Sequence, residues 1–173
     1  MLARDGIRRG HRGATDLEFA AVEIAVHESG TLKPSQLIGE PDRAVQILRH
    51  THRLDISSYS LQLGTKGDQL YEDFKEFCRI AKTTKVVNVT VPSGEHGTPF
   101  NEEVEHLQQL VTIGETEGIR VAVRSQLGCL SEDPDTLMVL CNNVDGLGIT
   151  LDPSVYICGS ANGKNLDKIL KFV

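Results

Sequence analysis

The feature that most constrains the fold is a regular alternation of short β-rich runs with helical patterns. The β-rich runs begin roughly 28–35 residues apart, which is the length of a βα unit. They cover residues 21–26, 56–63, 86–91, 119–124 and 147–151. Several are nearly continuous apolar runs, as expected for parallel strands buried on both faces. The alternation therefore predicts an α/β fold with a parallel sheet and right-handed crossovers.

Proline and capping residues mark the helices between these runs. Helix starts are indicated near Pro41, Asp68, Pro99, Asp133 and Asn165. Asp68 is expected to cap its helix through the side-chain carboxylate. Asp133 is followed by Pro134, which is the order of a cap and a first-turn proline. These signals predict one helix after each strand.

Two kinds of parallel fold fit this order, a doubly wound sheet and a barrel. No Gly-x-Gly-x-x-Gly follows the first strand and no Walker A loop is present, which removes the main evidence for a nucleotide-binding sheet. Polar residues follow several strands, as in a barrel whose site draws on many strands. A complete barrel needs about 250 residues and eight strands. The 173 residues therefore predict a partial (β/α) TIM-type barrel with about five parallel βα units.

The first 14 residues differ from the rest of the chain. Their basic side chains cluster among three glycines: Arg4, Arg8, Arg9, His11 and Arg12. Such a terminus is usually solvated and loosely held. We expect residues 1–14 to form a poorly ordered basic segment, with a phosphate-binding arm as the alternative. Residues 15–173 are expected to form a single barrel domain.

Composition excludes several partners. The net charge of −6 does not favour binding to nucleic acid or to anionic membranes. Only 5% of the residues are aromatic and none is Trp, so few side chains are suited to stack on bases. No apolar run approaches the ~20 residues of a membrane span, and no signal-peptide core begins the chain. The four cysteines form no Cys-x-x-Cys pair, which indicates reduced thiols. We expect a cytoplasmic protein with no nucleic-acid or membrane partner.

Candidate site residues follow the strands. They include His27, Glu28, Gln62, Thr65, Glu95, His96, Arg124, Gln126, Asp152 and Ser154. Parallel barrels build their sites at the carboxyl ends of strands, so these side chains are candidates to line one mouth. Asp152 supplies a carboxylate where its strand ends. His96 is a candidate substrate contact in a loop, with a solvated histidine as the alternative.

Two local motifs carry a resemblance to a known family. Glu-Gly-Ile-Arg-Val-Ala-Val at 117–123 and Leu-Gly-Ile-Thr-Leu-Asp-Pro at 147–153 resemble strands five and six of the xylose isomerase-like barrels. This is the sugar phosphate isomerase/epimerase superfamily, which also includes endonuclease IV. Glu23 resembles the acidic residue often found on strand two. The resemblance covers residues 15–173, as strands two to six of eight.

The chain departs from the family pattern at the metal ligands. Strand five of the family normally ends in a metal-binding Glu followed by Asn, and this chain has Arg124 and Ser125 there. Strand six normally ends Asp-x-x-His, and Val155 replaces the His. Asp152 is the one usual ligand that is matched, and strands seven and eight lie beyond the given sequence. The pattern is that of a divergent and incomplete barrel.

Arg124 has three open roles. It could form an ion pair with Asp152, because neighbouring strands bring their tips within reach. It could clamp the phosphate or carboxylate of a substrate. It could also face solvent, if the strand register differs from the one expected.

The resemblance implies aldose–ketose isomerisation or epimerisation of a sugar or sugar phosphate through a divalent ion (Mn, Mg, Co or Zn). Asp152 would be the metal ligand, and Arg124, His96 and Gln126 would bind the substrate. The alternative is a non-catalytic binding or assembly module that has lost the metal. Abasic-site DNA repair is disfavoured because it needs a zinc cluster rich in His and carboxylates. An open part-barrel exposes two strand edges, so association into a homo-oligomer is expected.

Overall fold

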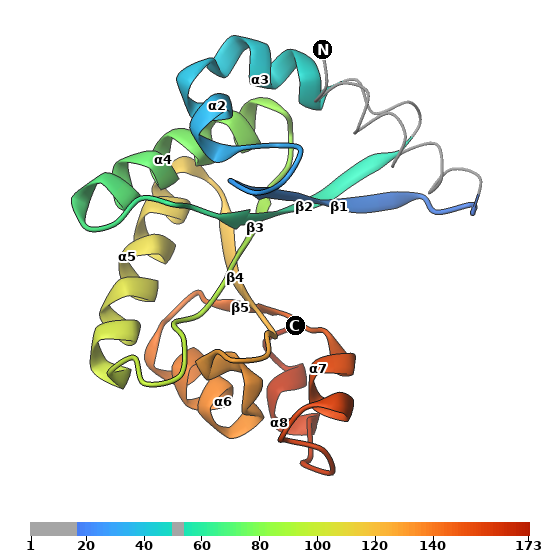
Figure 1. Ribbon diagram of the computed structural model, residues 1–173, viewed down its shortest axis with the longest axis vertical. Coiled ribbons are helices and arrows are strands. Elements are labelled where there is room, and N and C mark those ends of the chain that lie inside the picture. The colour runs from blue at the N-terminus through green and yellow to red at the C-terminus, as the bar shows by residue number, and fades with distance from the viewer. Residues whose placement is uncertain (1–16, 50–53) are drawn as a thin grey trace. The chain divides into compact units, whose positions relative to one another are not determined.

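The computed structural model describes residues 17–49 and 54–173; the expected basic segment at 1–14 lies outside them. Five parallel strands form one sheet in the order β1-β2-β3-β4-β5 (Figure 1). The strands are β1 (Ala21–His27), β2 (Asp55–Gln62), β3 (Asn88–Val91), β4 (Arg120–Arg124) and β5 (Gly148–Thr150). The expected α/β architecture of a partial TIM-type barrel is confirmed.

Helices alternate with these strands. They are α2 (Pro34–Gly39), α3 (Pro41–Leu48), α4 (Asp68–Thr83), α5 (Phe100–Glu117), the 3-10 helix η1 (Leu130–Glu132), α6 (Pro134–Asn143), α7 (Pro153–Cys158) and α8 (Asp167–Leu170). Asp133 caps α6 as predicted, because its carboxylate accepts from the backbone N–H groups of Asp135 and Thr136. The predicted Asp68 cap is wrong, since the cap position is Gly67, with a φ of 60°. Within the described ranges, no helix has the length and apolar character needed to cross a membrane.

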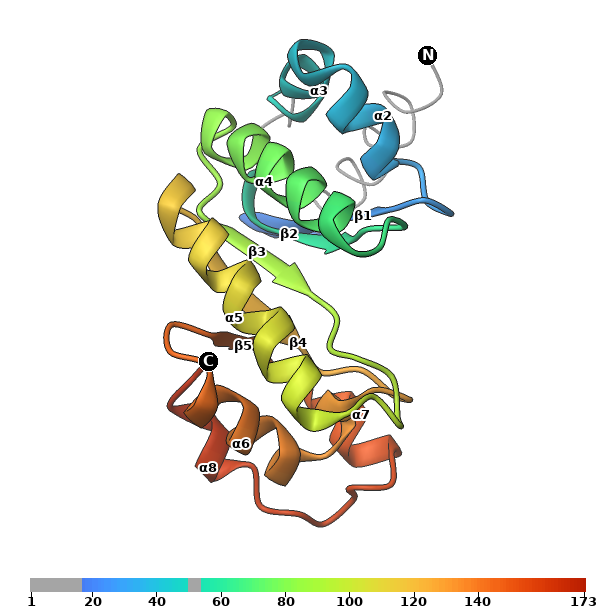
Figure 2. The same cartoon turned by 90° about the vertical axis from the view of Figure 1, so that its left-hand side faces the viewer.

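The described residues fall into two compact units, and the first holds residues up to 89 together with Glu117–Ile119. In this unit α2, α3 and α4 lie on one side of β1 and β2 (Figures 1 and 2). Its core includes the fully buried rings of Tyr59 and Phe77, packed edge to face at 5.5 Å between centroids. The aromatic stripe of α4 and the apolar face of β2 therefore hold this unit together.

The strand β1 is covered on one face only. Ile24 and Val26 are buried, whereas Glu23 and Ala25, which point the other way, are exposed. β1 is therefore not one of the strands that are buried on both faces. The helices of this unit cover the face that carries Ile24. The opposite face is open in the described part of the chain.

The second unit holds Thr90–Thr116 and Arg120–Val173. Its core includes the buried side chains of Leu107, Val123 and Leu140. The hydroxyls of Thr90 on β3 and Thr150 on β5 lie 2.8 Å apart, although β4 separates their strands. Neighbouring strands lie about 4.8 Å apart, so in a flat sheet β3 and β5 would be separated by about twice that spacing. The sheet is therefore curved here, with both threonines on its concave face.

The C-terminal segment of this unit covers one edge of the sheet. The backbone N–H of Ile149 on β5 donates to the carbonyl of Phe172 at 2.8 Å. Lys164 pairs with Asp133 at 2.5 Å and also with Asp135, which holds the segment against the start of α6. The expectation of two exposed strand edges is therefore wrong at Ile149, where the chain supplies its own partner.

Candidate functional site

The candidate site lies at the carboxyl ends of β3, β4 and β5, within the second unit. Arg124 is the last residue of β4 and pairs in register with Thr150. In-register residues of parallel strands project to the same face, so Arg124 shares the concave face with Thr150. The guanidinium Nε donates to Gln126 Oε1 at 2.6 Å, and both residues are half-buried. Two of the residues expected to bind substrate are thus in direct contact.

Asp152 is exposed and caps α7. Its Oδ1 accepts from the backbone N–H of Ser154 at 2.9 Å and from the Ser154 hydroxyl at 2.6 Å. Pro153 follows at the first helical position, which makes Asp152 a typical N-cap. The ion-pair role of Arg124 with Asp152 stays a prediction beside this capping role of Asp152.

Two backbone contacts hold the tips of β4 and β5 together. The N–H of Ser125 donates to the Thr150 carbonyl at 3.2 Å, and the N–H of Asp152 donates to the Ser125 hydroxyl at 3.3 Å. Ser125 is buried, and so is Val155 in α7. The position where the family has a metal-binding His is thus a core position of α7 in this chain.

The loop that carries His96 is tied to the loop after β4. The N–H of His96 donates to the Gly128 carbonyl at 3.0 Å, and the N–H of Leu130 donates to the Gly94 carbonyl at 2.8 Å. The His96 side chain extends to η1, where its Nε2 lies 3.0 Å from Glu132 Oε2. His96 thus lies beside a carboxylate that was not among the expected site residues.

Glu132 binds three neighbouring segments. Its carboxylate accepts from the N–H of Gly128 at 2.7 Å, from the hydroxyl of Ser160 at 2.7 Å and from His96. The Gly128 N–H, followed by the Ser160 hydroxyl and His96, lowers the pKa of the Glu132 carboxyl to about 2. No sequence signal could have identified this residue, because its partners are loop residues that only the fold brings near.

Glu103 is a buried carboxyl in the first turn of α5. It is 3% exposed, and its Oε1 accepts from the N–H of Gly94 at 2.9 Å. Burial raises the pKa of Glu103, and the Gly94 hydrogen bond opposes that rise. Acidic residues in a first helical turn are usually exposed and interact with the helix dipole, so no sequence pattern indicated that Glu103 is buried.

Polar residues of the first unit are engaged locally. Glu23 accepts from the Ser58 hydroxyl at 2.8 Å on the open face of β1 and β2. Glu28 accepts from both the N–H and the hydroxyl of Ser35, at 2.9 and 3.0 Å, and so anchors the start of α2. The Nδ1 of His27 lies 3.0 Å from the Ser29 hydroxyl. These contacts are structural, and they do not bring His27 and Glu28 together on one ligand.

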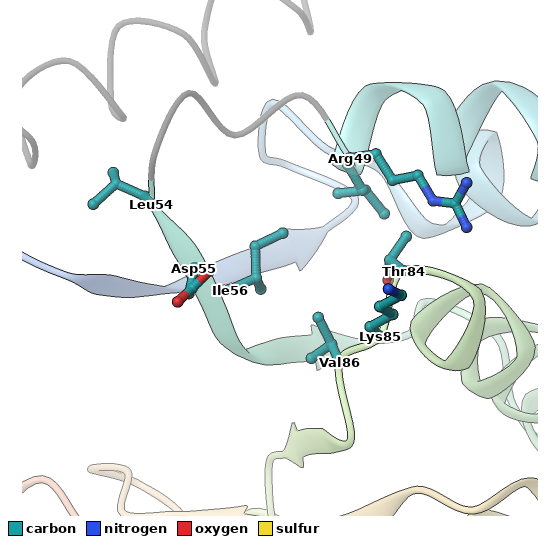
Figure 3. A pocket seen from close by; sticks show the side chains of 8 residues that line it. Arg49, Leu54, Asp55, Ile56, Thr84, Lys85 and Val86 are labelled. Carbon is teal, nitrogen blue, oxygen red and sulfur yellow. The ribbon is translucent and has the colours of Figure 1, made fainter.

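A cavity of about 560 Å³ in the first unit opens at the amino end of β2 (Figure 3). Its lining residues come from the end of α3, the start of β2 and the turn before β3: Leu48, Arg49, Leu54, Asp55, Ile56, Thr84, Lys85 and Val86. Parallel barrels place their sites at the carboxyl ends of strands, whereas Asp55 begins β2. The cavity is therefore not the candidate site.

The described residues do not fit a metal centre. No group of three or more His, Cys, Asp or Glu residues is gathered to hold an ion anywhere in residues 17–49 and 54–173. Asp152 contributes one carboxylate, and one of its oxygens is already bonded to Ser154. Catalytic metal sites use about three protein ligands or more. The described residues therefore supply too few ligands for a catalytic metal.

No family model matches the sequence, and no curated protein matches it. Solved structures do match, and three of them illustrate the likeness. They are the probable 3-DHS dehydratase AsbF from Bacillus anthracis (TM-score 0.70, 15% identity, 95% of this chain and 63% of that one), a xylose isomerase-like TIM barrel protein from Mycobacterium smegmatis in complex with magnesium (0.72, 14%, 95% and 63%), and a D-allulose 3-epimerase from Methylomonas sp. in complex with D-allulose (0.68, 15%, 92% and 61%).

The chain has the fold of the xylose isomerase-like TIM barrels. The expected resemblance is thereby confirmed at the level of the fold, since identities of 14–15% support no more than that. The chain spans less than two thirds of the length of these three structures. The matches nevertheless cover 92–95% of this chain, so its five βα units correspond to part of such a barrel.

Proposed function

We propose that the chain binds a sugar or sugar phosphate at the carboxyl ends of β3, β4 and β5, as part of a protein of the sugar isomerase or epimerase class. The observation that carries the proposal is the contact of Arg124 with Gln126 on the concave side of the sheet. Similarity in fold to an epimerase bound to D-allulose supports it. Barrels of this kind place substrates at this end of their strands.

The paired side chains suit a phosphorylated or hydroxylated ligand. A guanidinium offers a planar set of donors that matches phosphate or carboxylate oxygens. Because Gln126 accepts from Arg124 through its Oε1, its NH₂ group is directed by that bond and can donate to a sugar oxygen. His96 and Asp152 supply acceptors for sugar hydroxyls on neighbouring loops.

A matched pair of arginine variants tests this proposal. Arg124 ends β4 and the exposed Arg120 begins it, so Arg124→Gln and Arg120→Gln remove the same charge from opposite ends of one strand. In calorimetric titrations with D-allulose and with D-fructose 6-phosphate, we expect Arg124→Gln to weaken binding about tenfold or more. Arg120→Gln should bind as the wild type does. Equal affinities for the two variants would contradict the proposal.

A non-catalytic binding module is the second candidate function. It is favoured by Arg124 and Val155 at family ligand positions and by the lack of a metal-ligand group in the described residues. Metal analysis after supply of Mn, Mg, Co or Zn separates the two. Stoichiometric metal that is lost in Asp152→Asn, which keeps a capping side chain but removes the charge, would favour the enzyme. Sugar binding without metal would favour the module.

A further inference from the structure

The carboxylate of Glu132 is held by two contacts that do not involve His96. Its Oε1 accepts from the Ser160 hydroxyl at 2.7 Å, and its Oε2 accepts from the Gly128 N–H at 2.7 Å. The Glu132 side chain is 12% exposed, whereas that of His96 is 59% exposed. The backbone of His96 is also held, through its own N–H, by the Gly128 carbonyl. Both ends of the contact at 3.0 Å between Glu132 and His96 are therefore anchored.

This contact decides which nitrogen of His96 carries the proton. An ionised carboxylate can only accept hydrogen bonds, so Nε2 must donate to Glu132. The low pKa of Glu132, caused first by the Gly128 N–H, keeps it ionised at neutral pH. In a neutral imidazole the other nitrogen is then a bare acceptor. That nitrogen is Nδ1, on a ring that is largely exposed beside the loop following β4.

We infer that Glu132 and His96 form a carboxylate–histidine dyad in which Glu132 is a positioning residue and Nδ1 of His96 accepts a hydrogen bond from a hydroxyl group of the ligand. The inference rests on the proposed function for the identity of that ligand, a sugar. It adds to that function a residue, Glu132, and a defined atom, Nδ1. No proton leaves the ligand in this binding step; a hydroxyl hydrogen is shared with the Nδ1 lone pair.

The competing explanation is that the same contacts serve only to connect loops and have no part in ligand binding. Glu132 would then only join the loops after β3, β4 and α7, and Nδ1 of His96 would have no part in binding. Both explanations place the proton on Nε2, and they differ in the response of the His96 ring to sugar. That response can be observed without any enzymatic assay.

Nitrogen-15 NMR of the histidine side chains tests the tautomer directly. We expect the wild-type chain to show His96 protonated on Nε2, and Glu132→Gln to show a mixture of tautomers, since an amide can donate as well as accept. Ser160→Ala is the matched control, because it removes a contact of Glu132 without touching His96. It should keep the wild-type tautomer. A wild-type ring protonated on Nδ1, or an unchanged ring in Glu132→Gln, would overturn the inference.

A titration with D-allulose tests the ligand. The Nδ1 signal of His96 should shift on binding, and His96→Ala and Glu132→Gln should each weaken affinity by roughly threefold to tenfold. The double variant should lose little more than either alone, because the two residues act as one unit. Sugar binding that leaves the Nδ1 signal unmoved would overturn the dyad and leave the proposed function standing. Failure of the wild-type chain to bind any sugar would instead overturn both.

Discussion

Two glutamates of the second unit show how residues of one type acquire opposite properties. Glu132 accepts several hydrogen bonds near the surface, and its pKa is lowered to about 2. Glu103 is buried, and desolvation raises its pKa despite the bond from Gly94. The ionised form of Glu132 is therefore favoured by folding, whereas the ionised form of Glu103 is disfavoured. Their contributions to stability have opposite signs as the pH changes.

Glu103→Gln should remove a pH-dependent destabilisation of the fold. A carboxyl whose pKa is raised on folding stabilises the fold fully below its unfolded pKa, and this contribution is lost as the pH rises through the folded value. The unfolded value is near 4.5, and the amide keeps an oxygen to accept from Gly94. We expect the variant to gain stability relative to wild type as the pH rises from about 4.5 to neutrality. Urea unfolding across this range measures the difference.

The exposed neighbour Glu102 provides the control for that measurement. Glu102→Gln changes the net charge and the first turn of α5 in the same way, but the side chain lies at the surface. Its stability difference from wild type should stay nearly constant over the same pH range. A constant difference for Glu103→Gln as well would show that burial of Glu103 has no effect on its titration.

Local signals at single residues were predictable, and long-range ones were not. Asp133-Pro134 predicted a helix cap correctly because capping involves only the next three residues. Asp152-Pro153 has the same form, and the structure shows the same cap there, although the family resemblance had suggested a metal ligand. Two partners of Glu132, His96 and Ser160, are distant in sequence, so no pattern could reveal this cluster.

At the scale of elements, Gly94 allows the loop after β3 to pack against α5. A Cβ at this position would lie 2.7 Å from Thr98 Oγ1 and 2.8 Å from Glu103 Oε2, and Glu103 is buried. We expect Gly94→Ala to lower the free energy of unfolding by about 1–3 kcal/mol, as overpacking usually does. Gly39→Ala in α2 is the control, because its Cβ would meet no atom within 4 Å. Chemical denaturation should show a clearly larger loss in the free energy of unfolding for Gly94→Ala than for Gly39→Ala.

Element prediction succeeded where a pattern is long and failed where it is short. The helices α4 and α5 extend over several turns, so their apolar stripes were visible in the sequence. Neither α2 nor α7 was expected, because six residues make less than two turns and show no periodicity. The exposed face of β1 was also missed, since coverage of a strand depends on elements elsewhere in the chain.

At the scale of the whole molecule, the two ends of the sheet differ. β5 has a backbone partner of its own at Phe172, which no strand pattern in the sequence indicated. β1 is the other outermost strand, and no described strand pairs with its outer edge. Unpaired edges promote association between chains unless charges or bulges oppose it. The expected homo-oligomer therefore has one edge, β1, as its natural contact.

Ala25→Lys tests association through β1. Ala25 is an exposed residue of this edge strand, and charged side chains, lysine above all, oppose the pairing of edge strands with other chains. In sedimentation equilibrium we expect the wild-type chain to form dimers as its concentration rises and Ala25→Lys to remain monomeric. Gln109→Lys, at an exposed position of α5, adds the same charge away from the edge and should dimerise like the wild type. Loss of dimers in both variants would indicate a general effect of charge, and a monomeric wild type at every concentration would exclude the β1 contact.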